Sequence, residues 1–484
     1  MQSNLTLFDV TNLVVGAIIG ADIYVASSFG AGYLGPASLL VWVVAGVMAA
    51  VIALCFAQCT RLLPKVGGSY AYAREAWGPF AGFMVGWSLW LAEWISLAVF
   101  PVAFTRYLMF FIPGLGFFYQ TLVKILFVLF LMTTNIVGVK AAGRTNDALT
   151  LLKLLPLILF SFAGAAFIFS NPTAALSNLS PFLPFGWTNF GEALILIFWA
   201  YAGFELSAIP ADEVRRPEST IPKAIAIGMS IVTVFYLVTN FVLFGVRPWT
   251  QLSSDAAPLA SATQVILSIS PALGLVGGII VGGGALVSVA GSNESGMIGT
   301  SRLGYALAVD GLFPRAFAKL HSKYKTPYLG IVAQALTALI ASIYGELTLL
   351  VSSSVLFMAI AYLATCASIF VLKRKTSQTK SQGRLGAIVP GLGIVFSLYL
   401  ISQCSLVNFI AGLVLLAFGV LIYMKFSPQS ELTELKQALL SRRSRLERAY
   451  EQEHVFIAHA LQHVKRYYRR VTGKRQTWSQ EETS

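Results

Sequence analysis

Four ionisable side chains stand inside long apolar stretches, and these are the residues most suited to do chemistry. They are Asp22, Glu93, Lys153 and Glu205. In lipid, a charged group near the bilayer centre costs roughly 2.5 kcal/mol or more on insertion scales, so each such residue is a functional candidate by default. The alternative is that they form internal ion pairs that only hold a helix bundle together.

Two of these acids closely follow a glycine, in Gly20-Ala21-Asp22 and in Ala202-Gly203-Phe204-Glu205. A helix interrupted at such a site leaves backbone groups that hydrocarbon cannot satisfy, so a cavity or a ligand must satisfy them. Paired interruptions in two halves of a chain are typical of transporters built from inverted repeats, which hold the substrate between the broken helices. Alternatively, Gly16 and Gly20 form a small-residue packing face.

Trp90 and Glu93 lie three residues apart, so they share one helical face. A carboxylate beside an indole ring suits an ammonium group, because the ring adds cation–π attraction. We therefore include Trp90 as a binding candidate. Ordinary packing is the alternative interpretation for the neighbouring Trp87 and Trp94.

The composition shows that the elements positioning these residues are membrane helices. Of 484 residues, 56% are hydrophobic and 11% are charged, and the mean hydropathy is +0.73, whereas soluble proteins are about 25% charged. This excludes a disordered chain, a disulfide-rich secreted module and an ordinary cytosolic enzyme. The four cysteines form no Cys-x-x-Cys pair and predict no metal site. No removable signal peptide precedes the first apolar run.

Twelve apolar runs are long enough to cross a bilayer, which needs about 20 residues each. An all-α integral membrane protein with a 5+5 inverted repeat is predicted, preceded by a short N-terminus at 1–7. The first repeat covers 8–170, the second covers 187–372, and two extra helices occupy 386–426. The runs are 8–34, 36–61, 79–112, 118–139, 147–170, 187–209, 221–246, 264–293, 327–345, 347–372, 386–403 and 405–426.

The net charge of +13 is distributed unevenly between the two sides of the membrane. With a cytoplasmic N-terminus, thirty Lys and Arg fall on the inner side, and only Arg106, Lys124 and Arg247 fall on the outer side. The positive-inside rule therefore places both termini in the cytoplasm of a multi-pass plasma (inner) membrane protein. This placement also argues against nucleic acid as a partner.

Residues 427–484 differ in composition from the rest of the chain. They contain many basic residues, and leucines 432, 435, 439 and 446 are spaced for a helical stripe. A basic amphipathic cytoplasmic tail is predicted, which would rest on anionic lipid headgroups or on a cytoplasmic partner. A solvated helix with no partner is the alternative.

Three stretches in the right order resemble the amino acid–polyamine–organocation superfamily of permeases. They are Gly67–Pro79, Glu213–Pro217 with the following Ile221-Pro222, and Ser301–Tyr305 with Asp310–Pro314. The resemblance covers residues 8 to about 426. It implies a carrier, not an enzyme, that moves amino acids or related amines by alternating access. It also implies coupling to protons or sodium, or exchange, and no cofactor.

The resemblance also implies roles for individual residues. Trp199 matches the aromatic gate over the substrate, which Tyr201 would help to close, and Glu205 matches an acid linked to protonation. Lys153 matches a lysine whose ammonium replaces a sodium ion in related carriers. Desolvation can shift the titration of a lysine toward the physiological range. Proton coupling is therefore predicted through Lys153 and Glu205, together with hydroxyls such as Ser288 and Ser292.

The first break departs from the family pattern. Amino acid carriers of this family usually have a Gly-Ser-Gly-like turn there, which binds the substrate carboxylate, whereas this chain has Gly20-Ala21-Asp22. An ionised Asp22 about 4 Å from a substrate carboxylate would cost roughly 4 kcal/mol. Either Asp22 is protonated, or it points away, or the substrate presents an amine. Amino acids are the first prediction, a polyamine or other organic cation is the second, and a non-transporting nutrient sensor is the third.

Overall fold

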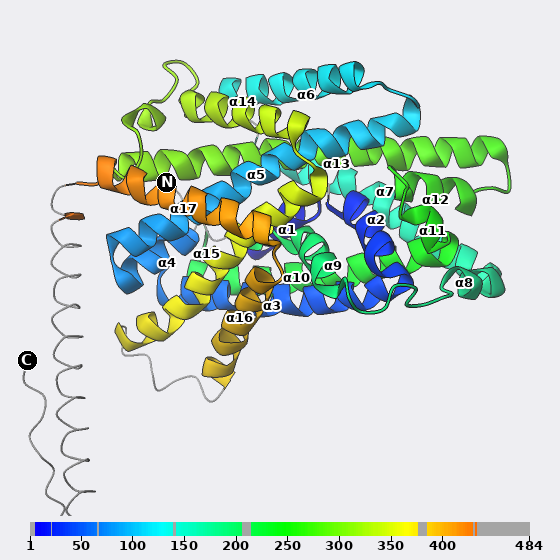
Figure 1. Ribbon diagram of the computed structural model, residues 1–484, viewed down its shortest axis with the longest axis horizontal. Coiled ribbons are helices and arrows are strands. Elements are labelled where there is room, and N and C mark those ends of the chain that lie inside the picture. Colours follow the sequence, from blue (N-terminus) through cyan, green and yellow to red (C-terminus); the bar gives the residue numbers. More distant parts are fainter. Residues whose placement is uncertain are drawn as a thin grey trace, which may run out of the picture. The chain divides into compact units, whose positions relative to one another are not determined.

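The computed structural model describes residues 5–20, 22–64, 67–138, 142–205, 214–375, 385–428 and 431–432, without the side chains of 142–153, 385 and 386. The chain divides into two units, Met1–Phe426 and Ser427–Ser484. The first unit contains all of the predicted membrane core (Figure 1). Nearly all of the predicted tail lies outside the described residues.

Helices make up the described part of the first unit, and its only β-type pairing there is a single bridge between Leu5 and Val214. The first half contains α1 (Leu7–Ile18), α2 (Asp22–Leu34), α3 (Ser38–Leu62), α4 (Gly68–Trp77), α5 (Pro79–Phe111), α6 (Phe117–Val137), α7 (Ala142–Ser170), α8 (Pro172–Asn178) and α9 (Phe190–Phe198), which the short helix η2 (Trp199–Tyr201) extends. The second half contains α10 (Pro217–Val246), α11 (Trp249–Leu252), α12 (Pro258–Ile266), α13 (Pro271–Val309), α14 (Tyr328–Tyr344), α15 (Leu347–Lys375), α16 (Leu385–Ser402) and α17 (Leu406–Phe426).

Each of the twelve predicted ranges overlaps a helix, but fewer helices would cross a bilayer unaided. Among the described residues, seven helical stretches are long and apolar enough, and α7 with α8, bent by 107°, would add an eighth. Four other apolar helical segments are shorter, at 10–17 residues: Leu7–Ile18, Phe190–Tyr201, Tyr328–Tyr344 and Ala387–Ser402. The first and sixth ranges fall short because each is broken. The eighth range, predicted at 264–293, is shifted. Helix α13 starts at Pro271 and continues past the polar residues Asn293 and Glu294, where the apolar run ends, to Val309.

Proline residues and a capping box mark where several helices begin. Proline occupies the first helical position of α5, α8, α10, α12 and α13, where its missing N–H costs no hydrogen bond. Thr6 and Asp9 form a capping box at the start of α1. These local signals set the ends of the helices that carry the site.

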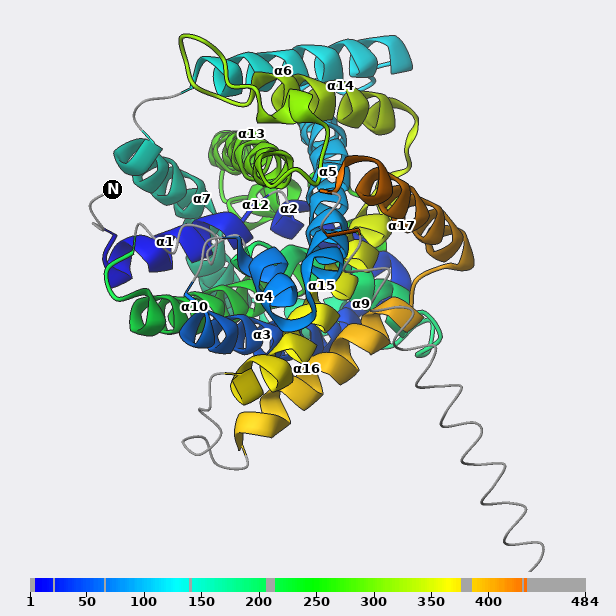
Figure 2. The ribbon, with the colours of Figure 1, turned by 90° about the vertical axis from the view of Figure 1, so that its left-hand side faces the viewer.

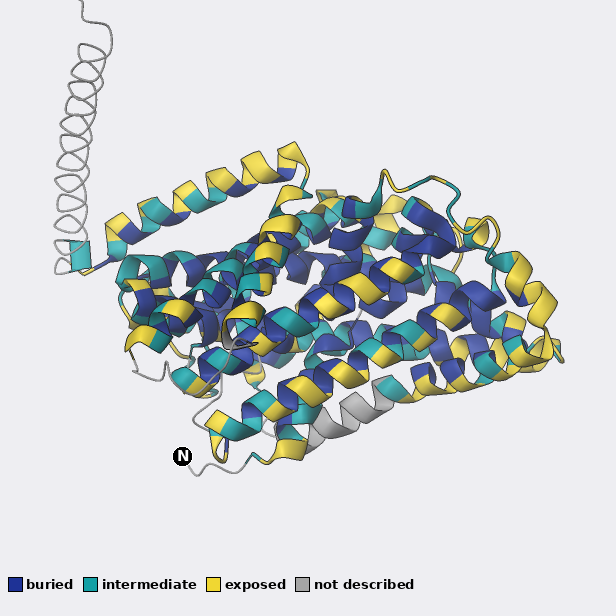
Figure 3. Ribbon diagram, turned by 90° about the horizontal axis from the view of Figure 1, so that it is seen from below, coloured by how far each residue is buried: buried dark blue, intermediate teal, exposed yellow. Residues whose placement is uncertain are grey.

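The helices pack as pairs that join distant parts of the sequence. The long α5 packs against both α13 and α15, and α10 packs against α3 and α1. Helices α6 and α14 lie side by side over α5 and α13 (Figure 2). Along many of these helices exposed and buried residues alternate on the ribbon, so one face of each helix is exposed and the other is covered (Figure 3). Ile19 at the first break and Phe204 at the second are buried, so the predicted breaks lie in the interior of the unit.

Candidate functional site: a cavity between two helix breaks

The first break separates α1 from α2. Helix α1 ends at Ile18, Ile19 has an extended backbone, and α2 starts at Asp22. Side chains of other helices satisfy two of the carbonyls released here. The Tyr236 hydroxyl donates to the carbonyl of Ile18 over 3.1 Å, and the Ser288 hydroxyl donates to the carbonyl of Gly20 over 3.3 Å. The broken backbone is therefore held by α10 and α13.

The second break follows η2. Ala202 has an extended backbone, and Gly203 has φ +118°, a conformation that side chains rarely allow. The Gly203 N–H donates to Oε2 of Glu205 over 2.9 Å. A methyl group on Gly203 would lie 2.6 Å from the carbonyl oxygen of Ala17. The two breaks therefore touch, and only glycine fits where they meet.

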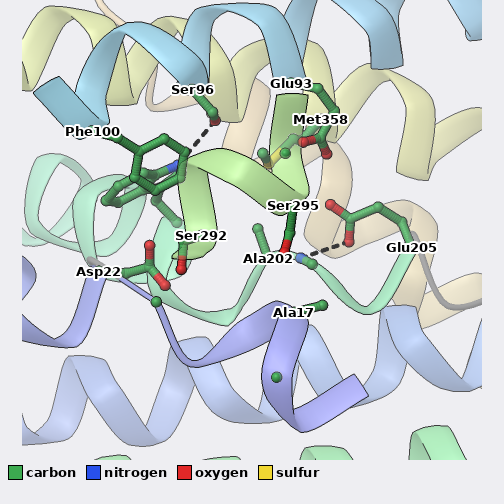
Figure 4. A pocket seen from close by; sticks show the side chains of 15 residues that line it. Ala17, Asp22, Glu93, Ser96, Phe100, Ala202, Glu205, Ser292, Ser295 and Met358 are labelled. Atoms are coloured by element: carbon green, nitrogen blue, oxygen red, sulfur yellow. Dashed lines mark hydrogen bonds between the residues drawn. The ribbon is translucent and has the colours of Figure 1, made fainter. Parts of the chain in front are cut away.

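A cavity of about 60 Å³ lies between the breaks (Figure 4). A cavity needs at least about 10–15 Å³ to hold one water molecule, so this one has room for water. Its walls come from α1, α2, α5, η2, α13 and α15 and from the two breaks. The lining residues are Gly16, Ala17, Gly20, Asp22, Glu93, Ser96, Phe100, Trp199, Ala202, Gly203, Glu205, Ser292, Ser295, Gly296 and Met358.

Three acids line the cavity. Asp22, Glu93 and Glu205 have exposed fractions of only 7%, 7% and 1%. Asp22 lies on one side, and Glu93 and Glu205 lie on the other (Figure 4). Glu93 and Glu205 interact electrostatically with each other and with Tyr362. None of the described lining residues is a Lys or an Arg. The described part of the cavity wall is therefore acidic.

Trp199 is fixed in the wall by a chain of hydrogen bonds. Its indole N–H donates to the hydroxyl of Ser96 over 3.2 Å, and that hydroxyl shares a 2.8 Å hydrogen bond with Ser354. The Ser354 hydroxyl donates in turn to the carbonyl of Ala92. The ring also lies 6.1 Å from the ring of Phe100. The tryptophan is thus held at one orientation beside the cavity.

Several lining residues were not predicted from the sequence. Ser96 and Phe100 follow Glu93 at positions i+3 and i+7, so the helical period alone places them on the same face. Ser295 follows the predicted Ser292 by three residues for the same reason. Met358 on α15 has no such signal, because nothing in the sequence relates its face to the breaks.

Two predicted site residues lie away from the cavity. The Trp90 ring stacks between two others: its centroid lies 5.2 Å from that of Trp87 and 5.8 Å from that of Trp94. Trp90 does not line the cavity. The Tyr201 hydroxyl donates to the carbonyl of Trp42 over 2.9 Å, so its ring also points elsewhere.

Three other predicted residues differ in how far the structure describes them. Ser288 bonds to the first break without lining the cavity. Ala21 lies outside the described residues, and so does the side chain of Lys153.

Two of the stretches that carry the family resemblance contact each other outside the predicted membrane spans. Arg74 on α4 forms a 2.9 Å ion pair with Asp310 at the end of α13, and the Tyr70 hydroxyl donates to the same carboxylate over 2.6 Å. Burial, and then the hydrogen bond to Asp310, raise the pKa of the Tyr70 phenol, so Tyr70 remains a donor at neutral pH. This cluster joins the two halves of the chain.

Residues 5–430 match a family model described as amino acid permease. The chain belongs to the amino acid permease family. The predicted resemblance is thereby confirmed, and this permease is a multi-pass membrane transporter, not an enzyme.

Characterised relatives resemble this permease over most of their length. The branched-chain amino acid permease BcaP of Bacillus subtilis is 28% identical, with 88% of this chain and 93% of the relative covered. The methylthioribose transporter of the same organism is also 28% identical, with 89% and 95% covered. The serine/threonine exchanger SteT of Bacillus subtilis is 26% identical, with 78% of this chain and 85% of the relative covered.

Proposed function

We propose that this permease is a proton-coupled secondary transporter of amino acids that works by alternating access. It sits in the plasma (inner) membrane with twelve spans, arranged as a 5+5 inverted repeat with two additional helices. Both termini and the basic tail face the cytoplasm. The chain is a carrier and needs no cofactor.

The observation that carries this proposal is the cavity between the two breaks. Gly203 lies against the carbonyl of Ala17, and the cavity walls combine backbone groups, three carboxyl groups and the ring of Trp199. Such a site can bind an ammonium group through the acids and release it when the helices around it move. Of the three relatives, BcaP and SteT are named for amino acids, which supports an amino acid as the substrate.

A polyamine or another organic cation is the second candidate. The three acids in the described part of the cavity wall, Asp22, Glu93 and Glu205, favour such a substrate. A zwitterionic amino acid must place its carboxylate away from these acids, for example toward the hydroxyls of Ser292 and Ser295. A diamine has no such constraint.

Protons are proposed to move through Lys153 and Glu205. The position of Ser288, whose hydroxyl donates to the carbonyl of Gly20, supports a link between protonation near α13 and the first break. Ser292 lines the cavity next to Gly20 and would serve the same link. Protonated Lys153 would hold the two halves together, and deprotonation would release them.

Uptake into proteoliposomes tests the substrate. Radiolabelled amino acids are offered with and without an inward proton gradient, and putrescine and cadaverine are added as competitors. We expect the gradient to drive accumulation of an amino acid. Competition by a diamine that exceeds competition by every amino acid would favour the second candidate, and binding without any accumulation would indicate a sensor.

Lys153→Ala and Glu205→Gln test the coupling in the same vesicles. Both variants are expected to lose gradient-driven accumulation by at least tenfold, because each removes one of the two groups through which the proton is proposed to move. Counterflow exchange then shows that the variants are folded. Lys425→Ala, at the end of α17, serves as the control. Accumulation by Lys153→Ala under a pH gradient would contradict the proposal.

A further inference from the structure

Two apolar hollows flank the outer face of α10. The first, of about 370 Å³, lies between α10 and α3. The second, of about 670 Å³, lies between α10 and α7. Both hollows are lined by Ser230 and Val234, so they adjoin along α10 on either side of these residues, and we call the two together the α10 groove.

Small residues create the first part of this groove. The α3 wall contains Gly46, Ala50 and Ala53, whose short side chains leave the face of α10 uncovered. Val234 remains 62% exposed between the two hollows. Among the described lining residues none is charged, and the shape suits a hydrocarbon chain.

The length of the groove matches one leaflet of a bilayer. Its α10 wall extends from Ile225 and Ala226 to Val238, a rise of roughly 18–20 Å at 1.5 Å per residue. Half of the hydrocarbon core is about 15 Å thick. A single acyl chain would therefore run along the groove and bring its headgroup to the level of the first turns of α10.

Basic residues gather at that end. Lys223 is exposed one turn before Ala226 on the same face of α10, and Arg215 and Arg216 are exposed just before the helix. Arg61 is exposed at the same end of α3, which runs antiparallel to α10: Gly46 meets Thr233, and Leu54 shares the hollow with Ile225. Glu218 is the only acid among the described residues in this first part of α10. Among the described residues at this end of α3 and α10, the four basic side chains therefore outnumber the one acid.

We propose that the α10 groove binds one anionic phospholipid, with an acyl chain between α3, α10 and α7 and its phosphate at Lys223. The chain itself gives little selectivity, because bulk lipid is as apolar as the groove. Selectivity comes from the headgroup, since each Lys or Arg near the membrane surface strengthens the binding of anionic lipid by about fivefold. The groove fixes the lipid in place beside these charges.

This lipid would touch a helix that is directly connected to the transport site. Helix α10 carries Tyr236, whose hydroxyl donates to the carbonyl of Ile18 at the first break. Gly228 of α10 packs so closely on α1 that a methyl group there would lie 2.6 Å from Val14. A lipid bound along α10 is therefore placed to influence how α1 moves.

Native mass spectrometry of the full-length, detergent-purified protein tests whether the groove prefers an anionic headgroup. Dioleoyl phosphatidylglycerol and dioleoyl phosphatidylcholine are titrated separately. We expect the protein to bind the anionic lipid more tightly than the neutral one. Lys223→Gln should lower the affinity for the anionic lipid about fivefold and leave the affinity for the neutral lipid unchanged. Lys425→Gln on α17 should leave both unchanged. Equal binding of the two lipids, or an unchanged preference in Lys223→Gln, would overturn the proposal.

Substitutions that fill the groove test whether an acyl chain occupies it. Val234→Trp is expected to abolish retention of phosphatidylglycerol, because the indole occupies the space between the hollows. Leu421→Trp, on an exposed apolar face of α17, should retain it. Ala50→Leu narrows the groove from α3 and tests the same point if Val234→Trp does not fold. Retention by both folded groove variants, or displacement of the lipid by glycerol 3-phosphate alone, would show that no chain occupies the groove.

Discussion

Single atoms decide whether the two breaks can meet. Gly203 combines φ +118° with a contact in which any side chain would strike the carbonyl of Ala17. Gly20 is similarly confined, since a methyl group there would lie 2.5 Å from the hydroxyl of Ser292. A hydroxyl can rotate or shift by a few tenths of an ångström, whereas a backbone carbonyl cannot. Gly203 is thus the stricter of the two positions.

Gly203→Ala is expected to reduce the initial uptake rate at least tenfold, because strained backbone of this kind costs about 1–3 kcal/mol before the clash with Ala17 is counted. Gly283→Ala on α13 is the control, since no atom lies within 4 Å of the added methyl group. It should transport normally and unfold at the same or a higher temperature. Normal uptake by Gly203→Ala would mean that the breaks do not need to touch.

Elements that are far apart in sequence are held together at the end of α13. Helix α4 leads into α5 through Gly78, and α13 ends just before Asp310. The ion pair between Arg74 and Asp310 connects them, with Tyr70 donating to the same carboxylate. Both charged side chains are about one third exposed, so the pair itself contributes at most about 1 kcal/mol.

Arg74→Gln and Asp310→Asn should therefore each lower the thermal unfolding midpoint by only a few degrees. The double variant should fall no further than either single variant, because the same interaction is lost once. Arg302→Gln removes an exposed charge from α13 and serves as the control. Additive losses in the double variant would show that the pair does not act as a unit.

At the scale of the whole molecule, orientation follows from where the basic residues lie. Only Arg106, Lys124 and Arg247 fall on the predicted outer side. Gly116 precedes α6 with open space around it, and Lys319 is exposed in the basic segment after α13. In the proposed topology, Gly116 lies on the outer side of the membrane and Lys319 lies on the cytoplasmic side.

Gly116→Cys should react with a membrane-impermeant maleimide on intact cells, and Lys319→Cys should react only after permeabilisation. The unsubstituted chain is the control, since Cys55, Cys59 and Cys366 are buried and Cys404 is half-buried. Labelling in the reverse order would invert the proposed orientation. Labelling of both on intact cells would contradict the number of spans between them.

The sequence by itself determined the membrane class, the apolar ranges and the positions of both breaks. Those properties are local: a run of apolar residues, or a glycine next to a carboxylate, has the same meaning whatever surrounds it. The family also followed from the sequence, because its motifs are short and occur in order. The side chain of Lys153 and nearly all of the tail lie outside the described residues, so their predicted roles stay predictions.

Only the tertiary structure decided which face of each helix lines the cavity. Trp90 belongs to a stacked row on α5, although it lies one turn before Glu93, and Met358 enters from α15. A soluble helix reveals its inner face through its apolar stripe, but a helix in lipid is apolar on both sides. The rotation of each helix, and therefore the set of lining residues, is fixed by packing against neighbours that the local sequence does not specify.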